Sequence, residues 1–172
     1  MSDFSPTTEA VIKWFRDISD IPRESKKEEK IRAWLLDWAK GHSFETKTDD
    51  AGNVLIKVPA TAGYENSPII VIQGHLDMVC EKTPDSPHNF DTDPIEFVFD
   101  GDWLKANKTT LGADNGIAIA MAMAVVEDKS VERPALELLF TVDEETGLTG
   151  ANALQPGFID GKVLLNIDSE DE

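Results

Sequence analysis

Apolar residues recur at helical spacing close to the start of the chain. Val11, Phe15 and Ile18 are three or four positions apart and therefore lie on one face of a helix. Ser5 and Pro6 precede this stripe, and a serine N-cap followed by proline is a common beginning for a helix. The pattern predicts a helix that begins at about Pro6 and buries its apolar face.

A second helical pattern follows in SKKEEKIRAWLLDWAKG. Ser25 and Glu28 have the spacing of a capping box, in which each side chain binds a free backbone N–H of the first turn. Gly41 is expected to end the helix. One apolar stripe, expected to pack in the core, consists of Ile31, Trp34, Leu35 and Trp38.

Short apolar and β-branched runs predict strands further along the chain. Residues 44–48 and 54–58 flank the turn sequence DDAGN, which is typical of a hairpin. The segment IEFVFDGDWLKA resembles a second hairpin around Asp100 and Gly101. Three further runs, apolar enough to be buried on both faces, occupy residues 68–72, 136–142 and 163–167.

One segment between these strands is ambiguous. ADNGIAIAMAMAVVED alternates large and small residues, as a strand can, but Ala and Met favour a helix from about Gly116 to Glu127. Asp114 or Asn115 can cap its start. Strands that alternate with helices in this way predict an α/β fold with helices covering a sheet.

Composition narrows the classes of function. The 172 residues include 33 acids and 16 bases, which gives a net charge of −17. Nucleic acid and anionic membrane surfaces bind cationic faces, so neither is expected as a partner. Cys80 is the single cysteine, which fits a reducing compartment, and the first residues have no signal-peptide pattern. A cytoplasmic location is expected.

Polar residues stand where the predicted strands end. His75 and Asp77 follow the first buried strand, Glu144 and Glu145 follow the second, and Asp168 follows the third. Function in open α/β sheets gathers beyond the carboxyl ends of the strands. These side chains are therefore expected to lie close together, with Asp114 entering the same region at the start of the buried helix.

Each of these residues also has an ordinary structural explanation. His75 could be a hydrogen-bonded histidine of the core, and Asp114 could simply cap the helix. Glu144 and Glu145 could belong to a solvated loop, and Asp143 is interpreted as a solvated or capping neighbour. Cys80 is expected to be a reduced, buried or partly buried bystander.

Taken together, the polar residues favour a metal site. One histidine with several carboxylates suits zinc or manganese bound by nitrogen and oxygen. A carboxylate two residues from His75 can accept the second imidazole N–H and so orient the ring. Two glutamates at the mouth of an apolar strand are costly if buried and unpaired, and a cation removes that cost.

Four motifs resemble one enzyme family. GHLDMVCEK, TTLGADNG, DEETGLTGA and LLNIDSEDE, in this order, resemble the aminoacyl-histidine dipeptidases, also called Xaa-His dipeptidases or peptidase D. These belong to the co-catalytic zinc peptidases. The resemblance implies a three-layer α/β/α fold with a mostly parallel mixed sheet, and hydrolysis of dipeptides, including those with C-terminal histidine.

The resemblance also implies roles for single residues. His75 and Asp168 would hold one metal ion, Asp114 would bridge two, and Glu145 would bind the second. Asp77 would orient His75. The general base, acting on a metal-activated water, would be Glu144. Zinc is favoured, with manganese or cobalt as alternatives.

Enzymes of this family are longer than 172 residues. The chain is therefore expected to be the N-terminal segment of a split catalytic domain, without the inserted second domain and without the C-terminal segment that supplies a further histidine. The segment alone is expected to be inactive or weakly active. The full-length protein is expected to be a homodimer.

Four alternatives remain open at this point. The chain could belong to a related metal-dependent deacylase of N-acyl amino acids or to a tripeptidase. It could be a non-catalytic metal-binding module, or an acidic α/β domain without a site.

Overall fold

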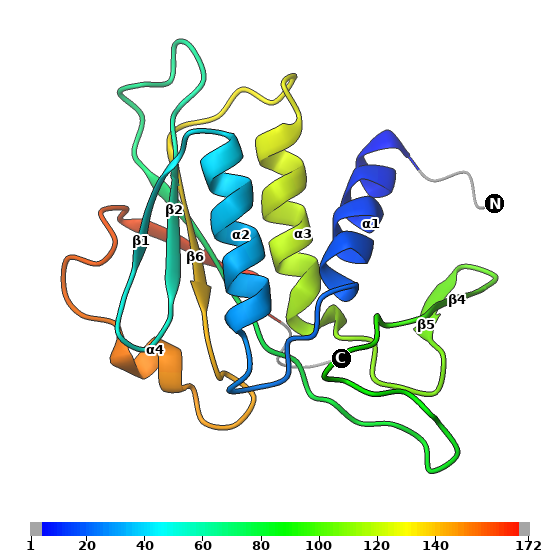
Figure 1. Cartoon of the computed structure of the whole chain (residues 1–172). Helices are drawn as coiled ribbons and strands as arrows, with labels where there is room; N and C mark the ends of the chain where they lie inside the picture. The colour runs from blue at the N-terminus through cyan, green and yellow to red at the C-terminus, as the bar shows by residue number, and fades with distance from the viewer. Residues whose placement is uncertain (1–4, 169–172) are drawn as a thin grey trace.

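The computed structural model of the chain describes residues 5–168 (Figure 1). The helices in this range are α1 (Pro6–Ser19), α2 (Glu29–Gly41), α3 (Ala113–Glu127) and α4 (Thr149–Ala153). The strands are β1 (Glu45–Thr48), β2 (Val54–Val58), β3 (Ile70–His75), β4 (Phe97–Asp100), β5 (Trp103–Ala106), β6 (Leu136–Thr141) and β7 (Val163–Asn166). Both predicted hairpins, β1–β2 and β4–β5, are confirmed.

The central sheet has the strand order β1-β2-β6-β3-β7. β1, β2 and β6 pair in antiparallel fashion, whereas β3 runs parallel to both of its neighbours, β6 and β7. The sheet is therefore mixed. The carboxyl ends of β3, β6 and β7 meet at one edge, as the sequence predicts.

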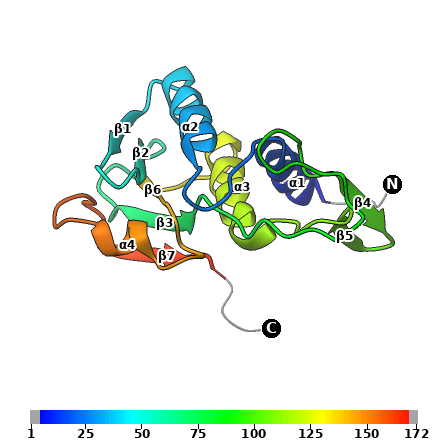
Figure 2. The ribbon, with the colours of Figure 1, turned by 60° about the horizontal axis from the view of Figure 1, so that its bottom comes forward.

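Helices lie on both faces of this sheet, which confirms the three-layer α/β/α fold (Figure 2). Successive strand residues point to opposite faces, and in β2 the side chains of Val54 and Ile56 join the core beneath α2 and α3. Leu55 points the other way and packs in a smaller cluster. That cluster also contains Val71 and Leu139, and it is covered by Leu154, Phe158 and Ile159 around and after α4.

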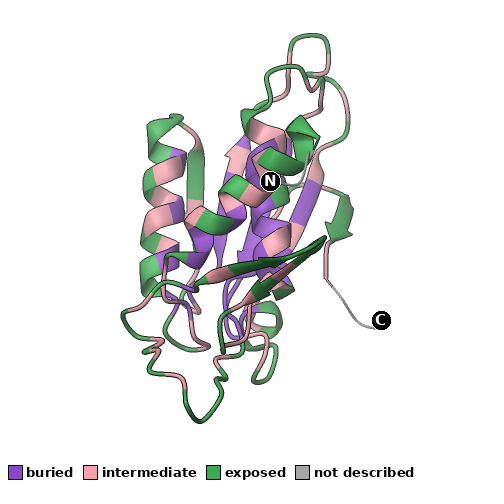
Figure 3. Cartoon of the chain, turned by 90° about the vertical axis from the view of Figure 1, so that its right-hand side faces the viewer, coloured by how far each residue is buried: buried purple, intermediate pink, exposed green. Residues whose placement is uncertain are grey.

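α1 begins and packs as its pattern predicts. The Ser5 side chain accepts a hydrogen bond from the backbone N–H of Thr8 (3.2 Å), and Pro6 is the first helical residue. Phe15 and Ile18 are fully buried. Figure 3 shows the same division through the fold, with buried residues on the strands and the inner helix faces and exposed residues on the outer faces.

The capping box predicted for α2 is wrong. The helix begins at Glu29, and no side chain in the described part of the chain caps it. The Ser25 hydroxyl instead donates to the Asp77 carboxylate (2.7 Å), and the Glu28 carboxylate accepts from the backbone N–H groups of Lys26 and Asp143 (2.9 Å each). Both side chains serve tertiary partners because buried polar groups need hydrogen bonds more than an exposed helix end does.

The predicted start of the buried helix is confirmed, but its predicted cap is not. Asp114 and Asn115 have non-helical backbone angles inside α3, so regular helix begins at Gly116. Neither side chain caps the helix, since both point to His75 and its surroundings. Among the described residues, no helix reaches the length and hydropathy needed to cross a bilayer.

Gly74 lets α3 approach the sheet next to the site. A Cβ at this position of β3 would overlap the side-chain oxygen of Asn115 and lie 2.9 Å from the Cβ of Ala118. We expect Gly74→Ala to lower the free energy of unfolding by about 1–3 kcal/mol, because added volume in a packed core forces its neighbours apart. Urea denaturation measures this change.

The matched control is Gly41→Ala in the last turn of α2. A Cβ there has no neighbour within 4 Å, so the free energy of unfolding should stay within about 0.5 kcal/mol or rise. Equal stability of the two variants would contradict close packing at Gly74.

Candidate metal centre

The candidate centre lies at the carboxyl edge of the three neighbouring strands. His75 is the last residue of β3 and stands opposite Thr141, the last residue of β6. Asp143, Glu144 and Glu145 follow β6, and Asp168 follows β7. Parallel pairing of β3 with both neighbours brings these chain segments to one place, although they are far apart in the sequence.

His75 uses its two ring nitrogens differently. It is 1% exposed, and Nδ1 lies 3.2 Å from Asp77 Oδ1 and 3.1 Å from the Asp77 carbonyl oxygen. Nε2 lies 2.9 Å from Asp114, 3.8 Å from Glu144 and 3.9 Å from Asp168. With Nδ1–H donating to Asp77, Nε2 is left to face three carboxylates, which is the orientation that a ligand histidine needs.

Carboxylates around His75 also shift its titration. Burial opposes the charged ring, but the hydrogen bonds to Asp77 and Asp114 and the charge of Asp168 raise the pKa of His75 to about 9. The ring therefore carries positive charge near neutral pH and offsets the negative charge of its neighbours. A divalent cation in this position would supply that charge instead.

Two groups of side chains offer ligand atoms close enough for a cation. His75, Asp114 and Asp168 form one group, and His75, Glu144 and Glu145 form the other. The ligand atoms within each group lie within 4.8 Å of one another. One imidazole and four carboxylates are donors that suit zinc and manganese, so the residues present fit such an ion.

Asp77 does more than orient His75. It is fully buried, and its carboxylate accepts hydrogen bonds from the backbone N–H groups of Glu144 (3.0 Å) and Glu145 (3.2 Å) and from the hydroxyl of Ser25. Burial would raise the pKa of Asp77, but these donors and His75 hold it below its usual range. One buried charge thus fixes both the histidine and the glutamate turn.

The interpretation of Asp143 as a solvated or capping neighbour is wrong. Asp143 is 5% exposed, its backbone N–H donates to Glu28, and its carboxylate accepts from the hydroxyls of Thr146 and Thr149. Its φ of 50° lies in the left-handed region, so the chain turns sharply here. Asp143 holds the turn from inside while the next two acids face the site.

Glu144 and Glu145 have pKa values above the usual range. Burial is the largest cause for both, and neighbouring carboxylates add to it, whereas His75 lowers both values. A carboxylate with a raised pKa holds a proton more readily, which suits acid–base chemistry near neutral pH. The neighbouring carboxylates that raise these pKa values also attract cations to the site.

Asn115 is a residue of the site that the sequence patterns did not reveal. Its side-chain oxygen accepts from the backbone N–H of His75 (3.2 Å), and its amide donates to the Ile167 carbonyl and to Asp168 (3.1 Å). It thereby joins the ends of β3 and β7, and a cis peptide bond links it to Asp114. Its place in LGADNG was the available signal, but that position also fits a helix cap.

The other two histidines do not belong to this cluster, and neither does the cysteine, which was predicted to be a bystander. His42 stacks on Phe44 and lies 2.8 Å from Glu127, and the ring of His88 packs against Phe90. Cys80 is partly buried, and burial raises the pKa of its thiol to about 11. Within residues 5–168, neither ligand group includes any of the three.

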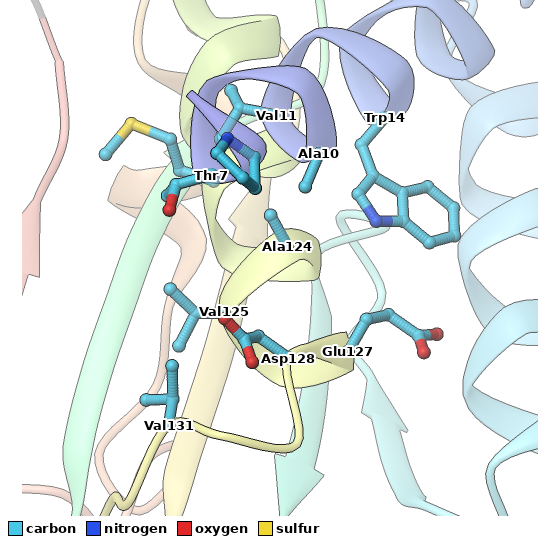
Figure 4. A pocket seen from close by; sticks show the side chains of 11 residues that line it. Thr7, Ala10, Val11, Trp14, Ala124, Val125, Glu127, Asp128 and Val131 are labelled. Carbon is cyan, nitrogen blue, oxygen red and sulfur yellow. The ribbon is translucent and has the colours of Figure 1, made fainter. Parts of the chain in front are cut away.

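A second hollow lies between the first turns of α1 and the last turns of α3 (Figure 4). Its walls are mainly apolar, with Val11, Trp14 and Val125 among them, and the acidic residues Glu127 and Asp128 also line it. Among residues 5–168, no histidine lines it. It is therefore separate from the candidate centre.

Comparison with known proteins agrees with the motifs. The chain is 47% identical over 158 residues to the cytosol non-specific dipeptidase of Escherichia coli (strain K12), covering 92% of this chain and 33% of that protein. No protein-family model matches the sequence. The resemblance to the aminoacyl-histidine dipeptidases is confirmed, and the chain spans about a third of the length of this relative.

Solved structures extend the comparison to the fold. The aminoacylhistidine dipeptidase of Vibrio alginolyticus superposes with a TM-score of 0.93 at 44% identity, covering 99% of this chain and 34% of that one. The aminopeptidase PepT of Bacillus cereus superposes with a TM-score of 0.76 at 25% identity, covering 95% of this chain and 44% of that one. The mixed α/β arrangement is shared by all three.

Replacing Asp77 tests its place beneath the centre. Asp77→Asn keeps the size but loses an acceptor oxygen, so Ser25 or the backbone N–H of Glu145 is left without a partner. We expect zinc affinity to fall about 10–100-fold, the usual effect of losing a residue that supports a ligand histidine. Competition with a chromophoric chelator measures the affinity.

Asp93→Asn is the control for this substitution. Asp93 also accepts a backbone N–H, from Asn89 (2.8 Å), but it is not part of either ligand group. Its replacement should leave zinc affinity unchanged. An Asp77→Asn variant with the affinity of the parent protein would show that Asp77 does not support the ligands.

Proposed function

We propose that this protein hydrolyses dipeptides, including those with C-terminal histidine, using divalent cations held at the candidate centre. The observation that carries the proposal is the position of His75 Nε2, which faces Asp114, Glu144 and Asp168 at 2.9, 3.8 and 3.9 Å. The likeness to two dipeptidases at 47% and 44% identity supports the same chemistry.

In the proposed site, His75 and Asp168 would hold one cation, Asp114 would bridge two, and Glu145 would hold the second. The group of donor atoms formed by His75, Asp114 and Asp168 supports the first position, and the nearness of Glu145 to His75 supports a second cation beside it. Zinc is the favoured ion, and manganese and cobalt have compatible ligand preferences. When bound, such ions lower the pKa of water and polarise the peptide carbonyl group.

Glu144 is the proposed general base. Its side chain is 28% exposed, so it can reach a bound substrate, and its backbone is tied to Asp77. Its raised pKa allows it to take a proton from water and later give it to the leaving amine. Asp77 has a different task, because it is fully buried and can only hold its neighbours in place.

We further propose that the chain is the N-terminal segment of a catalytic domain that continues beyond a second, inserted domain. β7 forms one edge of the sheet, and its side chains at Val163, Leu164 and Leu165 are 46–48% exposed. An apolar edge strand usually has a neighbour that covers it. A later segment could cover this edge and contribute a further histidine to the second cation.

The proposed substrate is a small peptide. A net charge of −17 argues against nucleic acid and anionic membranes as partners. A homodimer of the full-length protein and a cytoplasmic location complete the proposal, the latter in keeping with the Escherichia coli relative named for the cytosol.

The Glu144→Gln variant of the complete protein tests catalysis. Glutamine keeps the size but cannot accept the proton, so we expect kcat for a Xaa-His dipeptide to fall by at least about 100-fold. Metal content, measured by mass spectrometry, should be retained. Unchanged turnover would exclude Glu144 as the base, and loss of turnover together with loss of metal would reassign it as a ligand.

The substrate class needs its own comparison. A related tripeptidase or deacylase activity is the second candidate, and the likeness to the Bacillus cereus aminopeptidase supports a peptidase that acts on other peptides. Dipeptides, tripeptides and N-acyl amino acids should be assayed side by side with the complete protein. Preference for tripeptides or N-acyl substrates would overturn the dipeptidase assignment, and metal binding without any turnover would favour a non-catalytic module.

A further inference from the structure

Arg23 lies under the candidate centre without belonging to it. It is 2% exposed and stands in the loop between α1 and α2. Its Nη1 donates to the carbonyl oxygens of Leu76 (3.1 Å) and Asp77 (2.9 Å), and its Nη2 donates to the carbonyl oxygen of Gly112. The backbone carbonyl of Arg23 also accepts from the N–H of Met78 (3.1 Å).

These carbonyl groups belong to the two chain segments that carry His75 and Asp114. Leu76 and Asp77 directly follow His75, and Gly112 is two residues before Asp114. The two segments are not neighbours in the sheet, since Asp114 arrives from the start of α3. A guanidinium group has a rigid, planar fork of donors, so its contacts fix the separation of the two segments.

The glycines of LGADNG are shaped around this arginine. A Cβ on Gly112 would lie 2.5 Å from Arg23 Nη2, and a Cβ on Gly116 would lie 2.7 Å from the same atom. Gly112 also has a φ of 69°, which glycine adopts without strain. The motif that contains Asp114 therefore leaves room for the guanidinium on both sides of the ligand.

Arg23 also supplies positive charge below an acidic site. No other Lys or Arg side chain between residues 5 and 168 is buried. Burial lowers the pKa of Arg23 to about 10, and the charges of Asp77, Asp114 and Glu145 oppose that change. The guanidinium therefore stays charged at neutral pH and offsets part of the repulsion among the carboxylates.

We propose that Arg23 is a positioning residue. It holds the chain segments of His75 and Asp114 at the separation that lets both side chains bind the same cation. It contacts backbone carbonyls and therefore acts on the centre through the ligands. The inference rests on the proposed function in one respect, because the residues that Arg23 positions are the proposed metal ligands. According to this inference, Arg23 affects the affinity for metal and the arrangement of the metal ligands, and through them the rate of hydrolysis.

The test compares Arg23→Ala and Arg23→Lys with the parent in the complete protein. Lysine keeps the charge but cannot bridge both segments. We expect zinc affinity to fall about 10–100-fold in both variants, in the range found for residues that support metal ligands. Substituted Co²⁺ should change its visible absorption spectrum, because that spectrum reports the arrangement of ligands. A melting curve for each variant shows that it is folded.

Chemical rescue separates positioning from a general loss of stability. Methylguanidinium at millimolar concentration can fill the space left in Arg23→Ala and should restore part of the zinc affinity and the parent Co²⁺ spectrum. The matched control is Arg133→Ala. Arg133 also donates to a backbone carbonyl, that of Pro59 (2.6 Å), but far from the centre, so its loss should change neither readout.

Parent-like zinc affinity and Co²⁺ spectrum in both Arg23 variants would overturn the proposal. Full activity of Arg23→Lys would also overturn it, since charge alone would then suffice. If Arg23→Ala does not fold, Arg23→Lys decides by the same readouts. Failure of the proposed function would give a different result from failure of this inference. The parent protein would then bind metal without dipeptide turnover, and the effect of Arg23 on metal binding could still be measured.

Discussion

The candidate centre depends on the hydrogen bonds that the buried carboxylate of Asp77 accepts. A fully buried charge is costly unless donors surround it, and Asp77 finds donors in His75, in the hydroxyl of Ser25 and in the backbone of Glu144 and Glu145. These donors come from the end of β3, from the loop before α2 and from the turn after β6. Satisfying one charge therefore brings three segments together, and the orientation of His75 follows from it.

Charge balance is the second constraint. Several carboxylates converge at one edge of the sheet. Burial, together with the repulsion among these carboxylates, raises the pKa values of Glu144 and Glu145. Without a bound cation, the protonated ring of His75 and the guanidinium of Arg23 carry the compensating charge. A divalent ion would replace the proton of His75 but not Arg23, which lies behind the backbone of the ligand segments.

The same arrangement separates tasks among adjacent acids. Asp143 turns inward to Thr146 and Thr149, whereas Glu144 and Glu145 reach the open side of His75. A left-handed residue at Asp143 makes this division possible, because it reverses the chain directly after the strand. The three adjacent acids can stand side by side because their side chains point to different partners. The proposed division between general base and metal ligand follows from this arrangement.

The sequence by itself determined the main helices and strands, the edge of the sheet at which the polar side chains gather, and most of the residues that lie there. Hydrophobic runs that end in polar residues mark the carboxyl ends of parallel strands, so the positions of His75 and Asp168 could be predicted without coordinates, and the start of the buried helix indicated Asp114. Only the tertiary structure decided the partners of Ser25, Glu28, Asp143, Asn115 and Arg23. The spacing of Ser25 and Glu28 fits a helix cap equally well, and a local pattern cannot reveal a competing partner about fifty residues or more away. The packed fold decides which polar groups are buried and need hydrogen-bond partners. At Ser25 and Glu28, this need outweighed the local preference for a helix cap.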